Sequence, residues 1–185
     1  MNVYDFDKTI YDGDSSFDFY LYALRKRPVV VFFLPKLFYG LFLYAFKIVP
    51  LSKTKSLIFS FLSEIKDVDK LVEDFWKKNE KKIKSWYLET KDSSDVIISA
   101  GPSFLLSPIC EKLGVEKLIA TEMCKVSGFV FGRNCKGEEK VRRFIENYGD
   151  AEIENFFSDS LSDTPLAQIS KKAYLVDGDK ISPWP

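Results

Sequence analysis

The 185-residue chain contains no histidine. This absence excludes Ser-His-Asp and Cys-His catalytic triads, and it excludes zinc sites that depend on imidazole ligands. Any proton transfer must therefore come from carboxylates, lysines, tyrosines or metal-bound water.

Cysteine is scarce and neither sign of charge is in excess. Cys110, Cys124 and Cys135 are odd in number and form no close pair, which argues against a disulfide framework and favours reduced thiols in the cytoplasm. Lys plus Arg and Asp plus Glu each number 27, so the formal net charge is zero. With no overall field to attract a polyanion, we expect no nucleic-acid partner.

Apolar residues are plentiful, at 46% of the chain, and their pattern indicates an α/β fold. Helical periodicity marks 103–113 and 138–147, and it fills the segment 14–91. The short apolar runs expected to form strands are 2–6, 96–98, 118–120, 153–157 and 173–176. This alternation predicts a doubly wound parallel sheet with a Rossmann-like core from 1–13 and 92–185. The segment 14–91 is then an α-helical cap inserted after the first strand.

The stretch 29–49 is apolar and long enough to span a bilayer. Lys36, beside Pro35 at its middle, argues against spanning, because a central charge costs about 2.5–3.5 kcal/mol on insertion scales. Two packed cap helices broken at Pro35 are the simplest interpretation. A membrane-surface or lipid-binding face is the second, and a true span is the third.

Two aspartates follow the first predicted strand, at Asp5 and Asp7. In an extended segment, residues two apart point to the same face. Two carboxylates held this close repel each other unless a cation lies between them, and Mg²⁺ prefers such oxygen ligands. The alternative is a turn, which Asp also favours.

Further polar residues follow the later strands. Ser99-Ala100-Gly101-Pro102 joins a strand to a helix whose exposed amides could bind an anion, although such joints are often unliganded. Asp159 and Asp163 follow the run 153–157, where open α/β sheets place their sites, although helix caps explain them too. Lys136 precedes a predicted helix and Lys140 lies in its first turn, where a cation opposes the helix dipole.

Taken in order, these segments resemble the four motifs of the haloacid dehalogenase superfamily, and specifically its phosphoserine-phosphatase-like branch with a helical cap. Asp5-x-Asp7-x-Thr9 matches the first motif and Ser99 the second. The Lys136/Lys140 segment matches the third, and Asp159-x-x-x-Asp163 the fourth. The resemblance covers nearly the whole chain.

The resemblance implies a role for each residue. Asp5 is implied as the nucleophile and Asp7 as the acid and base, with Mg²⁺ bound by Asp5, Asp7, Asp159 and Asp163. Ser99, the amide near Ala100, and Lys136 or Lys140 are implied to hold the phosphoryl group. Ser99-Ala100-Gly101 replaces the Ser-Gly-Gly of phosphoserine phosphatases, which argues against an amino-acid substrate. Asp14 matches a substrate-contacting acid of the branch, or it is a helix N-cap.

We therefore expect a Mg²⁺-dependent phosphomonoester hydrolase that works through an aspartyl phosphate. Its substrate would be a small or lipid-like phosphate ester, and the aromatic residues of the cap would select it. Packing in the core of the cap explains the presence of these aromatic residues equally well. The alternatives are a phosphotransferase or mutase on the same scaffold, and a membrane-surface binding module without turnover. We expect a cytoplasmic protein, either free or peripheral at the inner membrane surface through 29–49.

Overall fold

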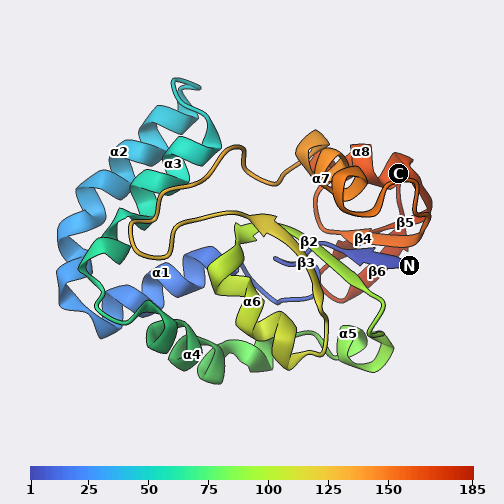
Figure 1. Cartoon of the computed structure of the whole chain (residues 1–185), viewed down its shortest axis with the longest axis horizontal. Coiled ribbons are helices and arrows are strands. Elements are labelled where there is room, and N and C mark those ends of the chain that lie inside the picture. The colour runs from blue at the N-terminus through green and yellow to red at the C-terminus, as the bar shows by residue number, and fades with distance from the viewer.

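One six-stranded sheet organises the computed structural model, which describes residues 1–185 (Figure 1). The strand order is β3-β2-β1-β4-β5-β6, with β1 to β5 parallel and β6 antiparallel to β5. The strands are β1 (Asn2–Tyr4), β2 (Val96–Pro102), β3 (Lys117–Thr121), β4 (Ile153–Ser158), β5 (Ser170–Asp177) and β6 (Lys180–Pro183). The predicted fold class is confirmed, and β6 is an addition that the sequence pattern did not predict.

Most of the helices lie between β1 and β2. The inserted ones are α1 (Ser15–Lys26), α2 (Leu34–Ala45), α3 (Leu51–Ile58), α4 (Val68–Asn79) and α5 (Ser85–Thr90), with 3₁₀ turns η1 (Pro28–Phe33), η2 (Phe59–Glu64) and η3 (Glu80–Lys82). The later ones are α6 (Ser103–Lys112), α7 (Glu138–Tyr148), η4 (Leu161–Asp163) and α8 (Thr164–Gln168). In Figure 1, α2 and α3 stand apart from the sheet, across a gap from α7 and α8.

Alternation along the central strands divides the hydrophobic core in two. Because successive strand residues face opposite ways, Val96 and Ile98 lie on one face of the sheet and Ile97 on the other. The first face packs against Phe144 of α7 and Leu166 of α8. The second is continuous with α6 and the inserted helices.

Local signals in the sequence fix the inserted helices. Asp14 caps α1 by accepting a hydrogen bond from the Phe17 amide at 2.9 Å, and Asp67 caps α4 in the same way. The buried face of α4 carries Phe75 and Trp76, and the Trp76 indole donates to the Leu105 carbonyl of α6 at 2.6 Å. This hydrogen bond links α4 of the insertion to α6.

The last inserted helix, α5, packs on the sheet although it falls within the predicted cap interval 14–91. Its Tyr87 meets Tyr4 of β1 edge to face at 5.0 Å between centroids, and Trp86 lies 5.7 Å from Phe157 of β4. We use the name cap for the inserted elements before α5, from α1 to η3.

The stretch 29–49 does not pack as a buried pair of helices. The chain changes from η1 to α2 at Leu34, and Pro35 lies in the first turn of α2, where its missing N–H costs nothing. Core packing explains Phe33 but not the other cap aromatics: Phe32 is 81% exposed, and the α2 side chains exposed with it include Phe38 at 65% and Phe42 at 54%.

Candidate active site

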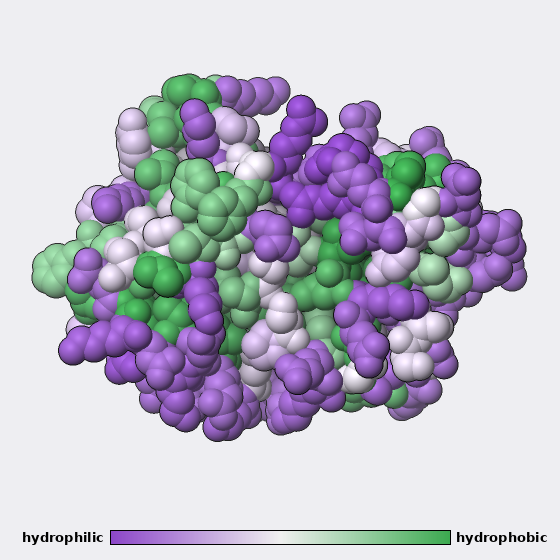
Figure 2. Space-filling model, viewed as in Figure 1, coloured by the Kyte–Doolittle hydropathy of each residue, from purple (hydrophilic) through white to green (hydrophobic).

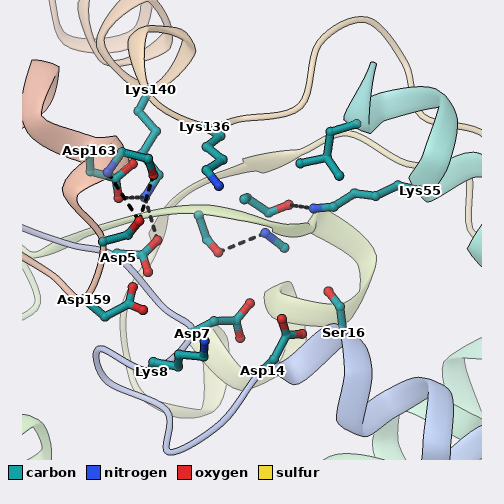
Figure 3. A pocket seen from close by; sticks show the side chains of 16 residues that line it. Asp5, Asp7, Lys8, Asp14, Ser16, Lys55, Lys136, Lys140, Asp159 and Asp163 are labelled. Carbon is teal, nitrogen blue, oxygen red and sulfur yellow. Dashed lines mark hydrogen bonds and ion pairs between the residues drawn. The ribbon is translucent and has the colours of Figure 1, made fainter. Parts of the chain in front are cut away.

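The carboxyl ends of β1, β2 and β4 meet at one edge of the sheet, beneath the cap, because these three strands are parallel neighbours. A cavity of about 330 Å³ opens there. Its lining consists mostly of charged and small polar residues: Asp5, Asp7, Lys8, Asp14, Ser16, Leu51, Lys55, Ser99, Ala100, Gly101, Lys136, Lys140, Asp159, Ser160, Ser162 and Asp163. All nine residues expected from the sequence therefore face one space (Figure 3).

Asp5 lies on the floor of this cavity, one residue beyond β1. Its amide donates to the Phe157 carbonyl at 2.8 Å, which holds it at the sheet edge. Its Oδ1 accepts a 2.6 Å hydrogen bond from Lys140 Nζ, and the same ammonium donates to Asp163 Oδ2 at 2.7 Å (Figure 3). A buried cation thus joins the first and last acidic motifs.

Burial and charge pull the pKa values of this group in opposite directions. Burial raises the pKa of Asp5 to about 6, although Lys140 opposes the rise. Burial alone would lower the pKa of Lys140, but the Asp5 and Asp163 carboxylates outweigh it and raise that pKa above its ordinary value. Lys140 therefore stays charged at neutral pH.

Asp7 lies at the cavity wall, although β1 ends at Tyr4 and an extended strand does not place it there. The loop turns at Lys8, whose φ is 58°, and the Ser15 amide donates to Asp7 Oδ1 at 2.8 Å. Burial, followed by the nearby charge of Asp14, raises the pKa of Asp7 to about 7. Asp14 caps α1, as one expectation had it, and it also lines the cavity; its contact with a substrate stays a prediction.

Ser99 is buried within β2, where its Oγ accepts from the Gly101 amide at 3.0 Å. The β2–β3 register shifts between Ile98 and Pro102, which turns this segment toward the cavity. A Cβ on Gly101 would lie 2.8 Å from Leu106, so the close packing with α6 favours glycine. Pro102 ends β2 and is the N-cap residue of α6.

The two candidate lysines have different environments. Lys140 is 1% exposed and carries two ion pairs. Lys136 precedes Gly137, the N-cap of α7, and its side chain points into the cavity without an ion pair (Figure 3). Both lysines face the site, but only Lys140 is bound to its carboxylates.

The fourth acidic segment follows β4. The Asp159 amide donates to Thr9 Oγ1 at 2.9 Å, and burial raises the pKa of the Asp159 carboxyl. Asp163 is buried in η4, and its Oδ2 accepts from Ser158 Oγ at 2.8 Å as well as from Lys140. Its Oδ1 is buried without a hydrogen-bond partner.

The donor set fits a small hard dication. Asp5, Asp7 and Asp159 offer carboxylate oxygens to one cavity, and burial raises the pKa of all three, a cost that a cation would relieve. The partnerless Oδ1 of Asp163 is a further free acceptor. These acids do not form a closed cage of three or more ligands. An ion here would keep waters or phosphate oxygens in its shell, as Mg²⁺ commonly does.

Lys55 is the cavity residue of most interest that the sequence did not reveal. It lies on α3 and its Nζ donates to the Ala100 carbonyl of β2 at 2.5 Å, so it bridges cap and sheet. Burial lowers its pKa to about 8, against the pull of Asp7 and Asp14. The available signal was its spacing of four from Leu51, which places both side chains on one helix face. Lys8, Ser16, Ser160 and Ser162 also line the cavity unpredicted.

Solved structures with this fold are similar to the chain at low sequence identity. A protein of unknown function from Bordetella pertussis Tohama I has a TM-score of 0.76 and 18% identity, with 94% of this chain and 87% of that one covered. A phosphoserine phosphohydrolase-like protein from Francisella tularensis subsp. tularensis SCHU S4 has a TM-score of 0.60 and 19% identity, covering 94% and 86%. A substrate-bound phosphoserine phosphatase has a TM-score of 0.54 and 17% identity, covering 92% and 82%.

Sequence comparison adds a partial relative and a family. The chain is 31% identical over 93 residues to Protein CicA of Caulobacter vibrioides, and this match spans 46% of the chain and 42% of that relative's length. The profile of the haloacid dehalogenase-like hydrolases matches residues 3–168, which include every candidate site residue. The expectation of a hydrolase of this superfamily is confirmed: the chain belongs to the haloacid dehalogenase-like hydrolase family.

Proposed function

We propose that the chain is a Mg²⁺-dependent phosphomonoester hydrolase whose substrate is a small or amphiphilic organic phosphate. The observation that carries this proposal is the pairing of two aspartates at the cavity. Asp5 is fixed on the floor by Lys140, and Asp7 lies on the wall with a pKa of about 7. A nucleophile and a proton carrier of neutral pKa are the two groups that stepwise ester hydrolysis requires.

In the first step, a carboxylate oxygen of Asp5 attacks phosphorus. An Asp5–phosphorus bond forms while the bond to the ester oxygen breaks, and protonated Asp7 donates its proton to the departing oxygen. In the second step, Asp7 takes a proton from water as that water attacks phosphorus. Inorganic phosphate leaves, and the Asp5 carboxylate and protonated Asp7 are restored.

Fixed positive groups around Asp5 would stabilise the transferring phosphoryl oxygens. Lys140 keeps its charge at the cavity floor, and Lys136 offers a second ammonium from the adjacent loop. Ser99 and Ala100 line the same cavity. Such preorganised donors are worth about 10²–10³ in kcat each in other hydrolases.

Asp5, Asp159 and the backbone carbonyl of Asp7 are the groups we assign to Mg²⁺, with Asp163 in support. When bound, the ion would neutralise charge on the phosphoryl oxygens. The cap contributes Ser16, Leu51 and Lys55 to the cavity, so the leaving group would meet these side chains.

The test is phosphate release from a panel of esters, from sugar phosphates and phosphoserine to lysophosphatidate, with Mg²⁺ or with a chelator. Asp5→Asn should lower turnover by about 10⁴-fold or more, as loss of a nucleophile does elsewhere. Asp12→Asn is the matched control, because Asp12 is exposed in the same loop and does not line the cavity. Wild-type turnover in Asp5→Asn would overturn the proposal.

A second measurement separates hydrolysis from transfer. Asp7→Asn should slow breakdown of the covalent intermediate, so mass spectrometry after rapid quenching should find a phosphoryl group on Asp5. Phosphate that appears on an added alcohol, in place of inorganic phosphate, would indicate a phosphotransferase. Silence across the panel would favour a binding module.

A further inference from the structure

The cap carries an unusually large exposed apolar surface, which we call the cap patch. It covers η1, α2 and the loop after α2, and Figure 2 shows apolar surface on this end of the molecule, at the left of the view. The patch consists of Val31, Phe32, Phe38, Tyr39, Leu41, Phe42, Tyr44, Phe46 and Ile48, each more than 40% exposed. Contiguous exposed surface of this kind marks an interaction site.

The packing of α2 explains why these side chains remain outside. Helix α2 contacts α3 through Gly40, whose missing side chain lets Leu57 and the Thr54 carbonyl approach within 3.5 Å of its Cβ position. Leu34 and Leu37 pack against the core, but most of the remaining side chains of α2 are exposed. The rings of Phe42 and Phe46 contact only each other, with centroids 4.6 Å apart and planes tilted by 44°. Pro28–Ala45 would be long and apolar enough to cross a membrane, yet only 11% of it is buried. The patch is therefore not the core of the cap.

The chain segment that forms the patch carries charge of one sign only. Between Asp18 and Glu64 there is no acidic residue, whereas seven of the 27 basic residues lie there, which leaves the rest of the chain at net −7. Six of the seven are exposed and none of those six forms an ion pair: Arg25, Lys26, Arg27, Lys36, Lys47 and Lys53. Elsewhere lysines pair freely with acids, for example Lys77 with Glu73.

We propose that the cap patch docks on an anionic lipid surface, with α2 lying in the plane of the interface. Aromatic side chains bordered by unpaired cations are the combination that inserts among headgroups. A second copy of the chain fits less well, because a twofold dimer through this patch would set two cationic caps against each other. Spanning is disfavoured as well, because it would strip α2 from α3 and place Lys36 in the hydrocarbon.

Docking would bring the cavity close to the membrane surface. Helix α3 packs on α2 of the patch at Gly40 and also contributes Leu51 and Lys55 to the cavity. The docking proposal does not depend on the proposed hydrolysis, because binding needs no turnover. The Asp5→Asn protein should therefore bind vesicles as the native protein does.

The experiment is co-sedimentation of the full chain with vesicles of phosphatidylcholine, with and without phosphatidylglycerol. We expect binding to the anionic vesicles that falls as salt rises. Lys36→Glu/Lys47→Glu should weaken binding about 25-fold or more, since each cation near the surface is worth about fivefold. Phe38→Ser/Phe42→Ser should weaken it similarly or further, by removing two inserting rings.

Matched controls lie at the other end of the molecule. Lys172→Glu/Lys180→Glu makes the same charge change at exposed positions, and Ile145→Ser/Leu161→Ser removes equally exposed apolar groups. Both should bind as wild type does. Circular dichroism checks that each variant is folded. If the Phe38→Ser/Phe42→Ser variant does not fold, the Lys36→Glu/Lys47→Glu variant still tests the proposal.

Four results would overturn the proposal: no binding to anionic vesicles at low salt, equal weakening in the distant controls, retention on membranes after an alkaline carbonate wash, or a patch-dependent dimer in sedimentation analysis without vesicle binding. The third would indicate a span and the fourth a second copy.

Discussion

The sheet edge and the cap depart from the usual distribution of residues in opposite ways. At the sheet edge, charged groups are buried, with Lys140 at 1% and Asp163 at 2% exposed. On the cap, large aromatic groups are exposed, as at Phe32 and Phe46. Buried charge and exposed apolar surface are the two informative exceptions to ordinary burial. We propose a ligand for each: a phosphate ester at the edge and a lipid surface at the cap.

The two regions also differ in how the exception is stabilised. Lys140 is surrounded by partners within the fold, because strand ends and α7 bring Asp5 and Asp163 to it. The cap patch has no such partner within the chain. Substitutions of the paired, buried charges at the sheet edge should therefore change stability and activity together, whereas those in the patch should change neither in dilute solution.

The largest expected effect is at Lys140. Lys140→Met leaves two carboxylates buried without their cation, which should lower the free energy of unfolding by about 3–5 kcal/mol. Turnover should also fall, by about 10²–10³-fold. Urea unfolding and steady-state rates measure both quantities. Lys136→Met makes the same change in a lysine without ion pairs and should alter stability by less than about 0.5 kcal/mol; an equal loss would contradict the difference between them.

Two phenylalanines of the cap sharpen the contrast between buried and exposed aromatic groups. Phe75→Ala empties a fully buried position in α4 and should cost about 3–5 kcal/mol in the free energy of unfolding. Phe38→Ala, on exposed α2, should remain within about 0.5 kcal/mol of wild type. Urea denaturation without lipid checks both. A large loss for Phe38→Ala would mean that the patch is covered within the protein.

Lys55 tests whether the cap takes part in the chemistry below it. Lys55→Met should lower kcat/KM by about 10–100-fold, the value of a hydrogen bond to a charged group. Because the pKa of Lys55 is about 8, the difference in kcat/KM between wild type and Lys55→Met should decline above that pH, as the ammonium loses its proton. Lys66→Met, an exposed cap lysine away from the cavity, is the control. A pH profile of Lys55→Met identical to wild type would remove Lys55 from the site.

The smallest expected effect is at Glu139 of α7, whose side chain does not line the cavity. Hydrogen bonds from Arg142, and then from Arg143, hold the pKa of Glu139 at about 2, below its ordinary 4.5. Since folding lowers this pKa, the stabilisation is complete above pH 4.5 and is lost as pH falls toward 2. Glu139→Gln should reduce the change in the free energy of unfolding over this pH range by about 0.5–1 kcal/mol. Thermal melts across this range measure it; unchanged dependence would mean that the pairs contribute nothing.

The sequence predicted the sheet and its acidic edge because both depend on local order. Short apolar runs form strands wherever they can be buried, and polar residues after parallel strands meet at one edge. Asp5, Ser99 and Asp159 were found in this way. Asp7 was found for a partly wrong reason: the strand ends at Tyr4, and a loop turning at Lys8 places its carboxylate.

The position of Lys55 in the cavity and the exposure of the cap aromatics could not be predicted from the sequence, because both depend on how helices pack. From sequence, Lys55 is one of several lysines on helical segments, and only the approach of α3 to β2 aims it at Ala100. The aromatic residues of 29–49 fit a core and a surface equally well until Gly40 is seen to set the contact with α3.

The sequence by itself determined the order of the elements, the chemical groups at the sheet edge and the one-signed charge of 19–63, because spacing and composition define these. Only the tertiary structure decided that Lys140 and not Lys136 bridges the carboxylates, and that the cap aromatics face outward. Both outcomes depend on distances between segments far apart in the chain: 135 residues separate Lys140 from Asp5. Sequence patterns carry periodicity within a segment, whereas the packing of one segment on another fixes which side chains meet.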